Sequence, residues 1–121
     1  ARAAVISGEE GLDELSTAGP SLAVNVGSAA LPSRITPEDA GLPRHPLAAI
    51  RGGDPAYNAA ALRRLLDGEA GAYRDAVLLN AAAALVVADR APNLTAGAQA
   101  AAEALDAGRA AALLDRWIAY R

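Results

Sequence analysis

The sequence predicts two or three short strands followed by about four mostly antiparallel helices, with the change near residue 53. Three observations support this fold. Residues 1–53 are rich in Gly, Pro and Ser and contain short β-branched runs, which are typical of strands and turns. Residues 54–121 carry apolar side chains at helical spacing. The connections expected between those helices are short, and short connections favour antiparallel neighbours.

Strands are predicted over residues 3–7 and 22–26, with a weaker one over residues 33–36, because Val and Ile recur there between turn residues. Between the first two strands, residues 11–16 predict a short helical segment that ends before Gly19-Pro20. A sheet of so few short strands is marginal by itself. We therefore expect strands from elsewhere to complete it.

The second half predicts helices almost throughout. Asp54 followed by Pro55 predicts the start of a helix over residues 55–67, because Asp accepts from the free amides of the first turn and Pro has no amide to leave unpaired. Residues 71–90 are apolar nearly all round, which predicts a central, buried helix. Two further helices are expected over residues 93–107 and 109–120.

Composition and charge exclude several classes of protein. The chain has 121 residues, enough for one domain at most or a piece of a larger one. It has no cysteine, which excludes disulfide scaffolds, zinc fingers and thiol nucleophiles. The net charge of −3 and the absence of a long basic run argue against nucleic-acid binding. No apolar run is long enough to span a bilayer, so no membrane partner is expected. Because residue 1 is Ala and not Met, we expect upstream sequence to be missing.

Few residues are candidates for chemistry. His45 is the single histidine, and its proline-rich surroundings predict an exposed loop residue more than a catalytic one. Residues 52–55 predict a glycine turn into an Asp-capped helix more than a phosphate site, because Asp54 places a negative charge where the anion would bind. Asn80 lies in the apolar helix, so its amide must find partners on a neighbouring helix or a loop carbonyl.

Asp13 and Glu14 are the most informative polar pair. These adjacent carboxylates follow directly after a predicted strand and are flanked by glycines. Carboxylate oxygens are preferred ligands of Mg²⁺, so the pair is a candidate metal site. An alternative remains open from the residues alone, because acids in the first turn of a helix also favour the helix dipole.

Four blocks, in order along the chain, resemble the family of anthranilate phosphoribosyltransferases. They read VISGEEGLDELS over residues 5–16, ITPEDAGL over 35–42, RGGDP with Asn58-Ala59 from residue 51, and RDAVLLNAA over 74–82. The resemblance covers essentially the whole chain. Ser7 departs from the histidine expected in many members of the family, but the acidic pair stays aligned.

The resemblance implies that residues 1–121 are the C-terminal part of the large α/β domain of such an enzyme, with a strand and loop half (1–53) and a helical half (54–121). It implies an Mg²⁺-dependent transfer of phosphoribosyl from phosphoribosyl pyrophosphate to anthranilate in tryptophan biosynthesis, with Asp13 and Glu14 as metal ligands. It also implies a cytoplasmic protein that is a homodimer when intact.

The family's glycine-rich phosphate loop, its phosphate-binding lysine and its anthranilate-binding arginine belong to upstream sequence, and this chain has no lysine. We therefore expect no catalytic or cofactor-binding residue here besides the metal ligands. The isolated chain is expected to depend on the upstream part of the same protein and to be inactive alone.

Two other interpretations remain open at this point. The chain is alternatively a non-enzymatic binding module, which includes nucleic-acid-binding relatives of the family, although its acidic charge argues against nucleic acid. It is also compatible with an enzyme similar to pyrimidine nucleoside phosphorylase. The block around Asp13 and Glu14, together with residues 74–82, favours the anthranilate enzyme over the nucleoside phosphorylase.

Overall fold

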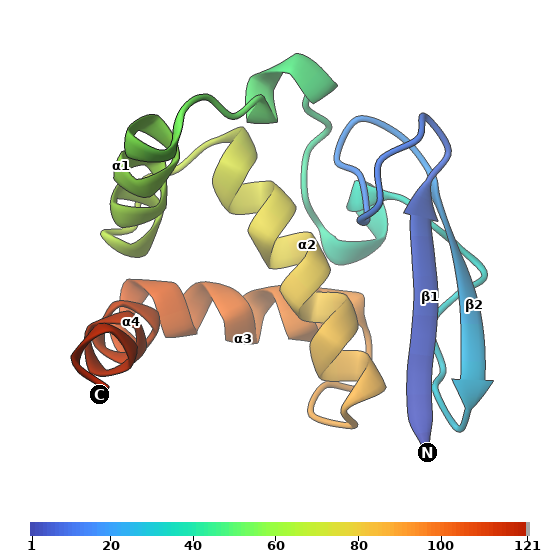
Figure 1. Cartoon of the computed structure of the whole chain (residues 1–121). Coiled ribbons are helices and arrows are strands. Elements are labelled where there is room, and N and C mark those ends of the chain that lie inside the picture. The colour runs from blue at the N-terminus through green and yellow to red at the C-terminus, as the bar shows by residue number, and fades with distance from the viewer. Residues whose placement is uncertain (121) are drawn as a thin grey trace.

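The computed structural model describes residues 1–120, and its elements follow the predicted order (Figure 1). The strands are β1 (Arg2–Gly8), β2 (Ser21–Gly27) and β3 (Arg34–Ile35). Two short 3₁₀ helices follow, η1 (Pro37–Ala40) and η2 (Leu47–Ile50). The α-helices are α1 (Pro55–Leu66), α2 (Ala72–Val87), α3 (Leu94–Asp106) and α4 (Arg109–Ala119). The three predicted strands and the four helices predicted in the second half are thus confirmed, with ends that differ by a few residues.

The three strands form one antiparallel sheet in the order β1-β2-β3. Its register pairs Val5 with Val24, and successive side chains point to opposite faces of the sheet. On one face, Ile6 and Ala23 pack into the hydrophobic core. On the other face, Val5 and Val24 remain 66% and 65% exposed. One face of the sheet therefore has no cover from residues 1–120.

Helix α2 lies at the centre of the molecule, between the sheet and α1 (Figure 1). On one side, Leu79 is completely buried and belongs to the same apolar cluster as Leu15 and Ile35. On another side, the adjacent Leu78 packs in a second cluster with Leu65 of α1 and Leu105 of α3. Burial on both sides confirms the prediction of a central helix.

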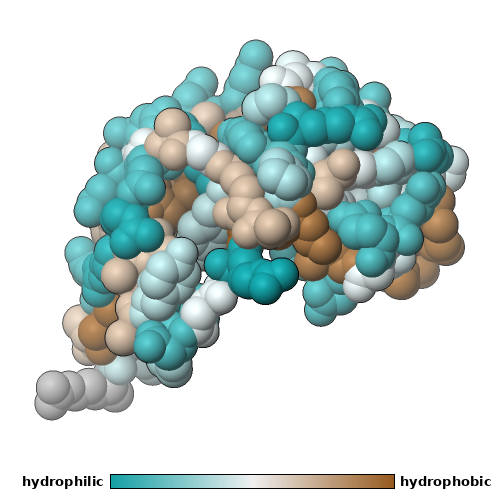
Figure 2. Space-filling model, turned by 90° about the horizontal axis from the view of Figure 1, so that it is seen from above, coloured by the Kyte–Doolittle hydropathy of each residue, from teal (hydrophilic) through white to brown (hydrophobic). Residues whose placement is uncertain are grey.

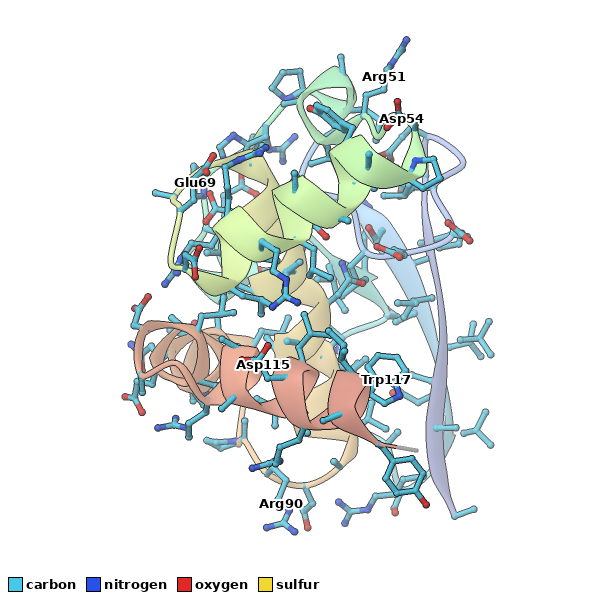
Figure 3. All side chains as sticks on the ribbon, turned by 60° about the vertical axis from the view of Figure 1, so that its left-hand side comes forward. Arg51, Asp54, Glu69, Arg90, Asp115 and Trp117 are labelled. Atoms are coloured by element: carbon cyan, nitrogen blue, oxygen red, sulfur yellow. The ribbon has the colours of Figure 1, made fainter. Side chains whose placement is uncertain are left out.

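The turn into α1 has the structure expected from residues 52–55. An oxygen of Asp54 accepts a hydrogen bond from the Tyr57 amide at 2.8 Å, and Pro55 is the first helical residue. The Asn58 side chain accepts from the Gly53 amide at 2.9 Å and donates to the Gly53 carbonyl at 3.0 Å. Figure 3 shows Asp54 and Arg51 together at this end of α1. The Asp54 carboxylate and the Asn58 side-chain amide are used in building the turn, which supports its structural role.

The last two helices differ in how far they are buried. The side chain of Asn93 caps α3 by accepting from the Ala96 amide at 2.9 Å. No residue of α4 is buried, and Trp117 near its end (Figure 3) is 75% exposed.

Within residues 1–120, no helix combines the length and the apolar character needed to cross a membrane.

The segment between β1 and β2, residues 9–20, is an irregular loop, so the helical segment predicted over residues 11–16 is wrong. Gly11 has a φ of 99°, in the left-handed region that a right-handed helix excludes. The Leu12 carbonyl accepts from the Gly8 amide at 2.7 Å, and both backbone polar groups of Leu15 bond to a side chain of α2. Because these groups already have partners, the segment gains nothing from helical pairing.

Candidate metal site

Asp13 and Glu14 lie at the exposed part of the β1–β2 loop, and the three residues that follow them are buried. The Leu15 side chain is only 1% exposed and packs in the main hydrophobic core. Behind it, Ser16 donates its backbone N–H to the hydroxyl of Ser21 at 2.9 Å. The loop therefore presents two carboxylates to solvent from a backbone that is anchored in the core immediately beside them.

Asn80 of α2 joins this loop to the centre of the molecule. Its Oδ1 accepts from the Leu15 amide at 3.0 Å, and its Nδ2 donates to the Leu15 carbonyl at 2.9 Å. The same Nδ2 also donates to the Ala76 carbonyl at 3.0 Å. The expectation that the Asn80 amide bonds a loop carbonyl is thus confirmed, and the loop in question is the acidic one.

His45 reaches the same region from a different segment. Its Nε2 lies 2.6 Å from Oδ2 of Asp75 on α2, and its backbone N–H donates to the Thr17 carbonyl at 2.9 Å. The His45 side chain is only 23% exposed, so the prediction of an exposed loop histidine is wrong. Asp75 lies thirty positions away along the chain, and no local pattern marked the two residues as partners.

Two further acids in the loop already have partners. Glu9 forms an ion pair with Arg34 at 3.0 Å, and Glu10 accepts a hydrogen bond from the hydroxyl of Ser16. Within residues 1–120, the carboxylates of Asp13 and Glu14 have neither a hydrogen bond nor an ion pair. Of the four acids in the loop, these two are the ones free to bind a cation.

The donor set suits one kind of cation. Across the residues that the structure describes, no group of three or more His, Cys, Asp or Glu side chains gathers around a common point. Two exposed carboxylates are too few for a closed structural metal site. Mg²⁺, in contrast, is commonly bound by one or two carboxylates together with waters and phosphate oxygens of a substrate. Asp13 and Glu14 fit Mg²⁺ in that role.

The chain combines an antiparallel sheet, whose β1–β2 loop carries Asp13 and Glu14, with helices packed on one face of that sheet. Residues 1–111 match the model of the glycosyl transferase family, a/b domain. The chain belongs to this family.

Individual relatives carry a more specific name. The anthranilate phosphoribosyltransferase of Sphingopyxis alaskensis is 61% identical over 97% of this chain, and that of Parvibaculum lavamentivorans is 53% identical over 95%. The crystal structure of the Thermus thermophilus enzyme of the same name is 46% identical and covers 98% of this chain with a TM-score of 0.88. This chain spans 36%, 34% and 35% of the three proteins, about a third of their length.

A more distant relative shows the fold alone. The anthranilate phosphoribosyltransferase of Saccharomyces cerevisiae, in complex with PRPP and Mg, is 24% identical and covers 94% of this chain with a TM-score of 0.85. The resemblance inferred from the four sequence blocks is confirmed by the nearer relatives. The arrangement of strands and helices is that of a fragment of these α/β enzymes.

Proposed function

We propose that this chain is the metal-binding part of an anthranilate phosphoribosyltransferase, with Asp13 and Glu14 as ligands of Mg²⁺. The observation that carries the proposal is the anchored loop, which leaves these two carboxylates free in a chain that belongs to the glycosyl transferase family. In the proposed reaction, the amine of anthranilate forms a bond to the anomeric carbon of phosphoribosyl pyrophosphate. The bond from that carbon to the pyrophosphate oxygen breaks, pyrophosphate leaves with the bonding electrons, and the amine nitrogen gives up one proton to water.

The role of the loop in this reaction is electrostatic. When bound, Mg²⁺ would offset the negative charge that develops on the departing pyrophosphate. The chain's own contribution is to hold Asp13 and Glu14 in place before the substrate arrives, so that little reorganisation accompanies the reaction. The buried Leu15 and its two hydrogen bonds to Asn80 supply that rigidity.

The remaining machinery is proposed to lie upstream in the same protein. Relatives named for this activity are about three times as long as the chain, and the chain has no lysine for phosphate binding. The uncovered face of the sheet and the exposed apolar side of α4 are the surfaces that such an upstream part would cover. The intact protein is proposed to be a cytoplasmic homodimer. The names of the relatives favour this function over a binding module or a nucleoside phosphorylase.

The test is a double variant of the complete enzyme, Asp13→Asn with Glu14→Gln, assayed with phosphoribosyl pyrophosphate and anthranilate across a Mg²⁺ titration. Loss of both charges should lower turnover by at least about a hundredfold, as expected when electrostatic stabilisation of a transition state is removed. Turnover is followed by the fall in anthranilate fluorescence.

Glu9→Gln is the matched control, because it removes one charge from the same loop at a residue paired with Arg34. It should retain nearly full turnover and an unchanged Mg²⁺ dependence. A double variant with the Mg²⁺ dependence of the wild type would overturn the metal assignment. The isolated 121-residue chain should give no turnover in the same assay, and a real signal from it would contradict the assignment of the remaining machinery to upstream sequence.

A further inference from the structure

We propose that Asn80 is a positioning residue for the metal site, acting through the backbone of the acidic loop without contacting the metal. This inference rests on the proposed function of Asp13 and Glu14. Asn80 sits on α2, 65 positions from Leu15 along the chain, and forms two hydrogen bonds with the backbone of that residue. Figure 1 shows α2 directly beside the loop at the end of β1.

The two hydrogen bonds control the peptide groups on either side of Leu15. The amide that donates to Asn80 Oδ1 belongs to the peptide unit that also contains the Glu14 α-carbon. The carbonyl that accepts from Asn80 Nδ2 belongs to the next unit. Because each peptide unit is planar, fixing both also fixes the direction in which the chain leaves Glu14. The orientation of the acidic pair is therefore coupled to α2.

Asn80 is itself held firmly enough to act as a reference point. It is half-buried in the central helix, next to the completely buried Leu79. Its Nδ2 also bonds the Ala76 carbonyl one helical turn earlier, which fixes the amide plane. Asn offers a donor and an acceptor on one planar group, the pair needed for a neighbouring N–H and C=O. An aliphatic side chain at this position would leave both Leu15 groups unpaired.

We call the pairing of one asparagine side-chain amide with the N–H and C=O of a single residue an asparagine clasp. The molecule contains a second clasp, which provides a matched control. Asn25 accepts from the Leu31 amide at 3.0 Å and donates to the Leu31 carbonyl at 2.7 Å. It joins β2 to the loop before β3 and carries no acidic pair beside the clasped residue. Breaking this clasp removes the same two bonds from a different loop.

The experiment compares Asn80→Leu and Asn25→Leu in the complete enzyme with phosphoribosyl pyrophosphate present, because the proposed metal site also uses phosphate oxygens of the substrate. Leu resembles Asn in shape but cannot hydrogen bond. Metal binding is followed by titration with Mn²⁺, which broadens the NMR signals of nearby amides. Asn80→Leu should weaken saturable broadening of residues 11–16 about tenfold, the effect typical of residues that orient metal ligands. Asn25→Leu should leave it unchanged. Hydrogen exchange of the Leu15 amide should accelerate only in Asn80→Leu.

A measurement on the wild type avoids any loss of folding in the variants. If the clasp favours metal binding, metal binding must favour the clasp by the same factor. Saturation with Mg²⁺ should therefore slow exchange of the Leu15 amide and leave the Leu31 amide unaffected. A Leu15 exchange rate that does not change at saturation would refute the coupling.

The outcomes separate the two proposals. If Asn80→Leu binds the metal with the same affinity as the wild type, Asn80 has no positioning role, and the assignment of the metal site still holds. If the complete wild-type enzyme with phosphoribosyl pyrophosphate shows no saturable broadening in the acidic loop, as expected for the double variant Asp13→Asn with Glu14→Gln, the metal site and the positioning role are both overturned. Weakened binding in Asn80→Leu, with wild-type binding in Asn25→Leu, supports both.

Discussion

At the scale of single residues, Glu38 and Arg44 form an ion pair that ties η1 to the segment before η2. Nε of Arg44 lies 2.6 Å from Oε1 of Glu38, and both side chains are about half exposed. The hydrogen bond from Arg44 is the largest cause that lowers the pKa of Glu38, from an ordinary value of 4.5 to about 2. The same bond raises the pKa of Arg44. Because the pair is exposed, solvent and salt reduce its effect on stability.

This pKa predicts the pH range over which the pair acts. A carboxyl with a lowered pKa in the folded state stabilises the protein above its unfolded pKa, and the effect disappears as pH falls through the folded pKa. The pair should therefore contribute fully above pH 4.5 and lose its contribution between pH 4.5 and about 2.

An NMR titration of the Glu38 carboxyl carbon checks this directly. The midpoint should lie near pH 2 in the wild type and move up toward 4.5 in Arg44→Gln. Arg90→Gln, which removes the same charge from the turn between α2 and α3, should not move it (Figure 3). A wild-type midpoint near 4.5 would show that the hydrogen bond is absent in solution.

At the scale of elements, the contact between α2 and α3 depends on small residues. Gly97 of α3 lies directly against Ala82 of α2, and Figure 1 shows that the two helices cross. A Cβ added at Gly97 would lie 2.8 Å from the α-carbon of Ala82 and 2.9 Å from its carbonyl oxygen. Those are backbone atoms of a central helix, so they cannot move without moving the helix.

Gly97→Ala should therefore destabilise the chain, although Ala is the better helix former. Overpacking costs about 1–3 kcal/mol and the gain in helix propensity is about 1 kcal/mol, so the net loss should be of order 1 kcal/mol. Urea denaturation measures it as a lower midpoint. Gly19→Ala is the control, because a Cβ there meets nothing within 4 Å and its φ lies outside the left-handed region. Equal midpoints for the two variants would contradict this account of the helix contact.

At the scale of the whole molecule, much apolar surface is left without cover. Figure 2 shows apolar side chains gathered at the sheet end of the molecule. They include the exposed valines and leucine of the sheet, Val5, Leu22, Val24 and Val26. A second apolar surface lies on α4, where Leu113, Trp117 and Ile118 are all more than half exposed. Surfaces of this kind mark interfaces with other parts of a protein.

Trp117→Ala tests which contacts α4 makes in the longer protein proposed above. In the 121-residue chain its effect should be within about 0.5 kcal/mol, because the side chain is already in solvent. Leu79→Ala, at a completely buried site, should cost about 2–5 kcal/mol. In the complete protein, Trp117→Ala should cost clearly more than in the chain alone. An equally small effect in both would show that the upstream part does not cover α4.

The sequence by itself determined the features that depend on neighbouring residues. Asp54-Pro55 predicted the start of α1, and the continuous apolar run predicted that α2 is central. The four blocks, which include Asp13 and Glu14, identified the family. These predictions succeed because the residues that form a helix cap, a hydrophobic repeat or a motif lie within a few positions of one another along the chain.

Tertiary structure alone decided the conformation of the acidic loop and the environment of His45. The loop is irregular because Asn80, 65 positions away, takes the backbone groups that a helical turn would have paired. His45 is half-buried because α2 brings Asp75 to it. The physical reason is common to both: a side chain's hydrogen-bond partners depend on which elements pack together, and that packing comes from burial of apolar surface across the whole chain.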